Sequence, residues 1–136
     1  MAKSQDKNNK KVSRAGVYQI FYHLVWTPKR RASVLRGLIA SDLKEIFEQV
    51  ASEKDISIKT MEVMPDHVHL FVSCNPKISP HLVIKSFKGA SSNILRKKYP
   101  QLLKLPCLWS SSYYCGTVGS VSDSVVQHYI QNQKGK

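Results

Sequence analysis

The chain has 136 residues, and its 21 lysines and arginines against nine acids give a net charge of +12. This length fits one compact domain, and an apolar fraction of 42% supports a hydrophobic core, which excludes a fully disordered chain. The three cysteines form no Cys-x-x-Cys pair, so neither a disulfide framework nor a thiolate zinc finger is indicated. No apolar run reaches the ~18 residues of a membrane span, and the basic N-terminus lacks the apolar segment of a secretory signal. We therefore expect a cytoplasmic protein.

The charge is distributed unevenly along the chain. Residues 42–66 contain seven of the nine acids and three lysines, so this window carries −4 and the remainder carries +16. Such an excess of positive charge indicates a polyanionic partner, with nucleic acid ahead of an anionic membrane. The alternative is a basic surface that serves only solubility.

The first half of the chain predicts one strand, one helix and a strand pair. Residues 1–14 are expected to be a basic flexible arm, and residues 15–136 a single domain. Residues 17–27 are β-branched and aromatic on both faces, which is typical of a central strand. A helix is expected at about 41–54, capped by Ser41 or Asp42, and strands at 56–63 and 67–73, separated by a turn at 64–66.

The second half predicts a long helix, a strand and a final helix. Ser79 before Pro80 marks the start of a helix that runs to about Lys98. Its apolar side is expected to contain Ile84, Phe87, Ile94 and Leu95. Gly89 within this helix costs about 1 kcal/mol relative to alanine, which suggests a close backbone approach there. Residues 108–118 predict the fourth strand, and the last helix falls at 122–133.

This order, β-α-β-β-α-β with an added helix, predicts a ferredoxin-like α+β fold. Its four-stranded antiparallel sheet is an RRM-like platform, with the first and third strands in the middle. Both core helices are expected on one face, which leaves the other face available for a ligand. Because many functions use this platform, the fold does not identify the activity.

His67 and His69 are the first candidate site residues. Residues two apart on a strand share one face, so these imidazoles lie side by side while Val68, Leu70 and Val72 face the helices. Two neutral imidazoles in this arrangement can bind one divalent metal ion. The alternative is a pair of surface histidines on a half-exposed strand.

Tyr129 and Gln133 are the second candidate pair. They are four residues apart and therefore share one face of the final helix. A glutamine carbonyl can be a metal ligand, and a tyrosine is a nucleophile when a cation stabilises its phenolate. The alternative is an ordinary packing stripe that also includes Val126 and Ile130.

Two further residues near the histidine pair have open roles. Asp66 either orients an imidazole from behind or is simply a turn residue. His23, on the first strand, lies either near the metal face or in the packing of the strand. The candidate DNA-binding residues are basic side chains of the first loop and the long helix, namely Lys29, Arg30, Arg31, Lys85, Lys88 and Arg96.

Five segments together resemble the TnpA-type single-tyrosine transposases of the HUH (His-hydrophobic-His) superfamily, which mobilise minimal bacterial and archaeal insertion sequences as single-stranded DNA. The segments are YHLVWTPKRR (22–31), MPDHVHLFV (64–72), IKSFKGASSNILR (84–96), LWSSSYYCGTVG (108–119) and VVQHYIQNQ (125–133). They occur in the order that the family shows and extend over nearly the whole predicted domain.

The resemblance implies a complete reaction. His67, His69 and Gln133 would bind Mg²⁺ or Mn²⁺, and Tyr129 would cleave single-stranded DNA at element ends, giving a 5′-phosphotyrosine and a free 3′-OH. Rejoining would need no ATP, in line with the absence of a GxxxxGK motif. The implied partners are DNA hairpins and a second subunit that exchanges its tyrosine helix, with no membrane and a nucleoid-associated location.

Three alternative hypotheses come from other functional classes. One is a domesticated relative that processes chromosomal palindromes by the same chemistry. Another is a non-catalytic single-strand nucleic-acid-binding module on the same platform. A third is a small zinc hydrolase, which would release its product without a covalent stage.

Overall fold

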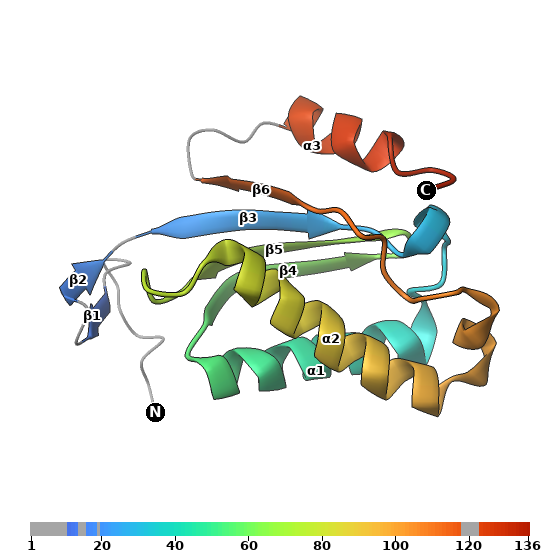
Figure 1. The fold of residues 1–136 in the computed structure, drawn as a ribbon, viewed down its shortest axis with the longest axis horizontal. Coiled ribbons are helices and arrows are strands. Elements are labelled where there is room, and N and C mark those ends of the chain that lie inside the picture. Colours follow the sequence, from blue (N-terminus) through green and yellow to red (C-terminus); the bar gives the residue numbers. More distant parts are fainter. Residues whose placement is uncertain (1–10, 14–15, 19, 118–122) are drawn as a thin grey trace.

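The computed structural model describes residues 11–13, 16–18, 20–117 and 123–136. A four-stranded antiparallel sheet has the order β4-β5-β3-β6, with α1 and α2 on one face and α3 on the other (Figure 1). The predicted α+β ferredoxin-like fold is confirmed, with the first and third core strands in the middle. The elements are β1 (Lys11–Ser13), β2 (Gly16–Tyr18), β3 (Phe21–Trp26), α1 (Gly37–Lys54), β4 (Ser57–Met64), β5 (His67–Ser73), α2 (Pro80–Lys98), β6 (Tyr114–Thr117) and α3 (Asp123–Gln131).

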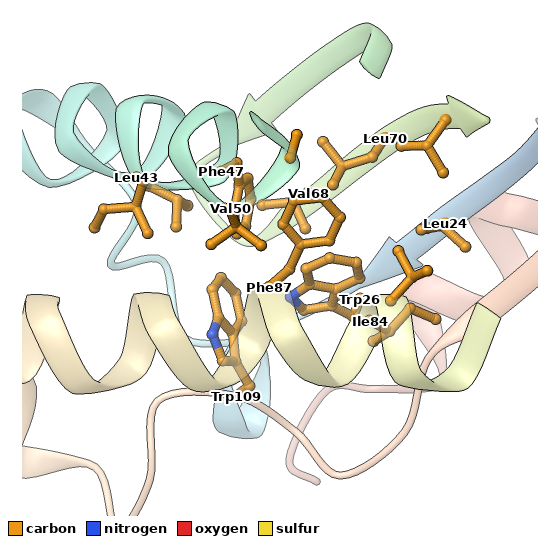
Figure 2. Close-up of a cluster of buried hydrophobic side chains, with 14 of the residues drawn as sticks. Leu24, Trp26, Leu43, Phe47, Val50, Val68, Leu70, Ile84, Phe87 and Trp109 are labelled. Carbon is orange, nitrogen blue, oxygen red and sulfur yellow. The ribbon is translucent and has the colours of Figure 1, made fainter. Parts of the chain in front are cut away.

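The core lies between the sheet and the helix pair α1 and α2. Trp26 of β3, Phe47 of α1 and Phe87 of α2 are fully buried, and the Phe47 and Phe87 rings meet edge to face at 5.1 Å (Figure 2). Val68, Leu70 and Val72 of β5 are also fully buried on this side, as their strand alternation predicts. Burial of these large side chains supplies the main stabilisation of the sheet on the helices.

The first predicted strand is divided into two pieces. Gly16–Tyr18 pairs with Lys11–Ser13 in a separate two-stranded sheet, and only Phe21–Trp26 joins the main sheet. Residues 1–10 of the predicted arm lie outside the described residues, whereas residues 11–13 are strand β1. The apolar pattern identified the central strand but not the interruption, because both pieces have strand-forming side chains.

The start of α1 differs from the prediction. The helix begins at Gly37, and the residue before it, Arg36, makes no side-chain cap. Asp42 therefore lies inside the helix, where its carboxylate accepts the Tyr99 hydroxyl at 2.6 Å and Lys98 Nζ at 2.8 Å. Burial of Ile39 extends the apolar stripe one turn earlier, so tertiary packing outweighs the local capping signal.

The start of α2 follows the prediction, but two details of the helix do not. Ser79 Oγ accepts the backbone N–H of Leu82, and α2 spans Pro80–Lys98. Ile94 is 48% exposed, since the buried side of α2 is formed by residues such as Val83 and Leu95. No other atom lies within 4 Å of the position of a Cβ on Gly89, so the expected close approach does not occur within the described chain.

In the described part of the predicted strand at 108–118, residues 108–113 are not a strand and lie beside α2. Only Tyr114–Thr117 pairs with β3, while Trp109 forms an isolated bridge with Pro28. Trp109 is 5% exposed and its indole N–H donates to Ser91 Oγ of α2 at 2.9 Å. The backbone of Leu108 and Ser110 bonds to residues 27–29 just after β3, while the buried indole joins the segment to α2.

Among the described helices, none has both the length and the apolar character needed to cross a bilayer.

Candidate active site

The histidine pair of β5 lies on the sheet face opposite α1 and α2. His67 and His69 alternate with fully buried Val68 and Leu70, and both imidazoles are partly exposed. The period-two alternation of a strand therefore turns both rings away from α1 and α2, as the sequence predicted.

His67 contacts the carboxylate of Asp66, which in turn pairs with Arg31. Asp66 Oδ1 lies 2.9 Å from His67 Nδ1, and Asp66 Oδ2 lies 3.2 Å from Arg31 Nε. An ionised carboxylate can only accept, so His67 Nδ1 carries a proton, and in a neutral imidazole Nε2 is then the nitrogen with the lone pair. Asp66 is also a residue of the turn between β4 and β5, and its carboxylate contacts the His67 ring.

His23 contacts the second histidine of the pair. His23 Nδ1 lies 2.9 Å from His69 Nε2, and the His23 ring stacks on Phe71 with 4.5 Å between centroids. Burial lowers the pKa of His23, which favours its neutral form. His23 thus packs against the strand and also belongs to the histidine cluster, so neither of its two predicted roles excludes the other.

Helix α3 lies on the sheet face opposite α1 and α2 (Figure 1). His67 and His69 belong to this face, because they alternate with the buried Val68 and Leu70. Val126 and Ile130 pack against Val25 of β3, and Val25 is the cross-strand partner of His69. The helix was predicted to run to residue 133 but ends at Gln131. Gln133 therefore lies in the following turn and not on a helical face with Tyr129, and its backbone N–H bonds to the Ile130 carbonyl. The small apolar stripe of α3 therefore determines which side of the sheet receives Tyr129 and Gln133.

Tyr129 and Gln133 are joined through a serine that the sequence analysis did not select. Ser112 Oγ lies 3.0 Å from the Tyr129 hydroxyl and 2.9 Å from Gln133 Oε1, and Ser110 Oγ lies 3.4 Å from the same Gln133 oxygen. Burial raises the pKa of Tyr129, and the Ser112 hydrogen bond opposes that rise. The serine run before Tyr113 was the only sequence signal for this contact.

Lys88 of α2 fixes the backbone of this serine segment. Its Nζ donates to the Ser110 carbonyl at 2.8 Å and to the Ser112 carbonyl at 2.9 Å. Burial lowers the pKa of Lys88 to about 8, with a smaller opposing effect from Cys107. The amine is therefore a structural link between α2 and the residues that contact Tyr129.

The end of α3 is attached to the basic loop after β3. Arg31 Nη1 donates to the Ile130 carbonyl and the Gly135 N–H donates to the Arg30 carbonyl, both at 3.4 Å. Arg30 and Arg31 have φ values of 60° and 54°, a backbone conformation that is unfavourable for residues with side chains. Since Arg31 also pairs with Asp66, one side chain connects the tyrosine helix with the residue that orients His67.

The six basic residues predicted to bind DNA fall into two groups. Lys88 and Arg31 make the internal contacts just described, and Arg96 donates to the carbonyls of Leu102 and Leu105 at 3.3 and 2.8 Å. Lys29 is partly exposed, whereas Arg30 and Lys85 are exposed. Lys85 and Lys88 also line a cavity of about 510 Å³ between α2 and residues 107–113.

Histidine nitrogens and a carboxamide oxygen are the candidate ligands for a metal ion on this face of the sheet. Across residues 20–117 and 123–136, no three His, Cys, Asp or Glu side chains form a group that could hold a metal ion. His67 fits such a role, because its Nδ1–H is bonded to Asp66 and its Nε2 lone pair is available as a ligand. His69 and the carbonyl oxygen of Gln133 would complete a nitrogen and oxygen set. In this structure both atoms contact other side chains, His69 Nε2 with His23 Nδ1 and Gln133 Oε1 with Ser112 Oγ, each at 2.9 Å.

Known proteins resemble this chain over most of its length. A family model described as "Transposase IS200 like" matches residues 16–133. ISDra2 transposase TnpA of Deinococcus radiodurans is 40% identical over 129 residues, which are 93% of this chain and 92% of that protein. The IS200 transposase of Salmonella typhimurium is 29% identical over 115 residues, which are 82% and 75% of the two chains.

Two solved structures share the fold. A crystal structure of a candidate transposase from Deinococcus radiodurans R1 has a TM-score of 0.85 and 35% identity, and the match covers 93% of this chain and 99% of that one. A REP-associated tyrosine transposase bound to a REP hairpin has a TM-score of 0.53 at 12% identity, over 82% and 62% of the two chains. The second similarity concerns the fold alone.

Proposed function

The chain belongs to the IS200-like transposase family, and from this premise we propose that it cleaves and rejoins single-stranded DNA through Tyr129. The observation that carries the proposal is the docking of α3 on the histidine face of the sheet. This docking brings a phenol and a carboxamide to the side where two imidazoles project.

The reaction is a transesterification at phosphorus. Tyr129 first loses its phenolic proton to water, and its oxygen then attacks the scissile phosphorus in line. The bond from phosphorus to the 3′ oxygen breaks, and that oxygen leaves as a 3′-OH after taking a proton from water. The product is a 5′-phosphotyrosine that retains a phosphodiester, so a second 3′-OH can reverse the step without ATP. Burial keeps Tyr129 protonated near neutral pH, so the rate of attack should rise with pH.

The proposed metal ligands are His67, His69 and Gln133. A Mg²⁺ or Mn²⁺ ion bound by them would supply Lewis-acid charge beside the scissile phosphate. Asp66 keeps His67 in the tautomer that leaves Nε2 available, and Arg31 keeps the Asp66 carboxylate in position. These two contacts orient the ligand before any ion arrives.

The proposed DNA path follows the exposed cations. Three of the predicted DNA-binding residues have side chains that make none of the internal contacts given above for Arg31, Lys88 and Arg96. These three, which can therefore bind a phosphate backbone, are Lys29, Arg30 and Lys85. Among similar folds, the REP-associated transposase is bound to a hairpin, which supports a hairpin as the substrate form here. Salt should weaken this binding, because phosphate contacts release counterions.

The decisive experiment is a covalent capture. The purified protein with Mn²⁺ and single-stranded hairpin DNA should give an adduct on a denaturing gel, and EDTA should prevent it. Tyr129→Phe and His67→Ala should give none. The matched control is Tyr114→Phe, because the Tyr114 ring lies 6.3 Å from that of Tyr129 and its loss should leave the adduct intact. An adduct that persists in Tyr129→Phe would assign the nucleophile to another residue.

We also propose a homodimer in which the tyrosine helix can serve the partner's site. Mixing Tyr129→Phe protein with His67→Ala protein tests this directly, since only a mixed dimer contains one intact histidine pair and one intact tyrosine able to meet. Adduct formation in the mixture alone supports exchange. If the mixture forms no adduct, the result would mean that the tyrosine helix serves only the site of its own subunit.

A further inference from the structure

A single hydroxyl group, that of Ser112, contacts both Tyr129 and Gln133. The oxygen-to-oxygen distances are 3.0 Å to the phenol and 2.9 Å to Gln133 Oε1, and Ser112 is only partly exposed. Ser112 is neither one of the proposed metal ligands nor the proposed nucleophile. Because Ser112 has a single hydroxyl proton, it can donate a hydrogen bond to only one of these two oxygens at a time.

The direction of both hydrogen bonds follows from counting protons. A carboxamide oxygen can only accept, so Ser112 donates its one hydroxyl proton to Gln133 Oε1. The Tyr129 hydroxyl must then donate to Ser112 Oγ. Once the phenol has lost its proton to water, the Tyr129 oxygen can only accept, and Ser112 can supply a donor there only by turning away from Gln133.

We propose that Ser112 is a positioning residue that couples the nucleophile to the metal ligand. Its hydroxyl donates to Gln133 while Tyr129 is a phenol, and turns to the Tyr129 oxygen when that oxygen becomes a phenolate. The same rotation removes the stronger of the two serine bonds to Gln133 Oε1 and leaves only the longer bond from Ser110. The inference rests on the proposed function for the roles of Tyr129 and Gln133.

The backbone around Ser112 is fixed, which makes a side-chain rotation the simplest adjustment. Lys88 Nζ holds the Ser110 and Ser112 carbonyls at 2.8 and 2.9 Å from the α2 side. The Ser112 hydroxyl points the other way, toward α3. The segment therefore acts as a fixed support, and only one hydroxyl hydrogen has to change direction.

The test separates metal binding from turnover. Direct Mn²⁺ binding, measured by electron paramagnetic resonance without DNA, should be about fivefold tighter in Ser112→Ala, because Ser112 no longer competes for Gln133 Oε1. At saturating Mn²⁺, the rate of adduct formation should fall about tenfold, because the phenolate loses its donor. A serine that served packing alone would give weaker metal binding together with the slower rate.

Two variants keep the test decisive. Ser111→Ala removes the exposed neighbouring hydroxyl and should match the wild type in both measurements. Ser112→Thr keeps the hydroxyl and should restore both. Mn²⁺ binding in Ser112→Ala that is unchanged or weaker overturns the inference, as does a Ser112→Thr protein that behaves like Ser112→Ala. If the wild type binds Mn²⁺ but forms no adduct, the proposed function fails, and the Mn²⁺ series still decides the role of Ser112.

Discussion

On one face of the sheet, α1 and α2 cover a continuous apolar core that contains Trp26, Phe47 and Phe87. On the other face, α3 rests on Val25 with Val126 and Ile130 as its buried side chains. The first face is held by burial of large side chains, which is non-directional and strong. The second relies on hydrogen bonds that run through Ser112, Arg31 and Lys88.

This difference suits a division between a scaffold and a site. A large apolar core tolerates little rearrangement, so the strands that present His67 and His69 are kept in place. A helix held by two buried apolar side chains and by exchangeable hydrogen bonds belongs to the less stable part of a fold, from which moving catalytic elements are drawn. The proposed exchange of α3 between subunits requires this lower stability.

The largest expected effect is on the sheet face that α1 and α2 cover. Phe87→Ala should lower the free energy of unfolding by roughly 3–5 kcal/mol, because it leaves a cavity beneath Trp26 and Phe47. Urea denaturation measures the loss. Ile94→Ala on the same helix is the matched control and should cost under about 1 kcal/mol, since that side chain is 48% exposed. Equal losses in the two variants would contradict the described orientation of α2.

A smaller effect is expected on the α3 side. Ile130→Ala removes a side chain that is only 4% exposed, and should weaken docking of α3 by about 2 kcal/mol. Amide hydrogen exchange in residues 123–131 should accelerate, while α1 and α2 exchange as in the wild type. Val125→Ala, at an exposed position of α3, should leave the exchange unchanged. Faster exchange throughout the sheet would show that the two faces are not independent.

The smallest expected effect concerns Lys88, which links α2 to the serine segment that contacts Tyr129. Lys88→Met removes both donors to the serine carbonyls and should cost roughly 1 kcal/mol at pH 7. The folded pKa is about 8 and the unfolded value is near 10.5, so between these values the unfolded chain binds the extra proton. Stability of the wild type relative to Lys88→Met should therefore increase as pH rises through this range.

Urea denaturation at pH 7, 8.5 and 10 measures this dependence. Lys85→Met, at an exposed position one turn earlier on α2, is the control and should follow the wild type. A difference between wild type and Lys88→Met that stays constant with pH would mean that the amine is not buried as described.

The amino-acid sequence determined which side of the sheet the histidine pair occupies. Strand alternation separates His67 and His69 from Val68 and Leu70, and helical spacing puts Val126 and Ile130 on one face of α3. These are properties of one element, so local periodicity is sufficient to predict them. The helix start at Ser79 was equally local and was predicted for the same reason.

Only the tertiary structure decided what touches these residues. Ser112 and Tyr129 are 17 residues apart, His23 and His69 are 46 apart, and Arg31 and Ile130 are 99 apart. No periodic signal connects such positions, because each contact depends on how complete elements pack. The start of α1 and the path of residues 108–113 were mispredicted for that reason, since burial of Ile39 and Trp109 outweighed the local preference.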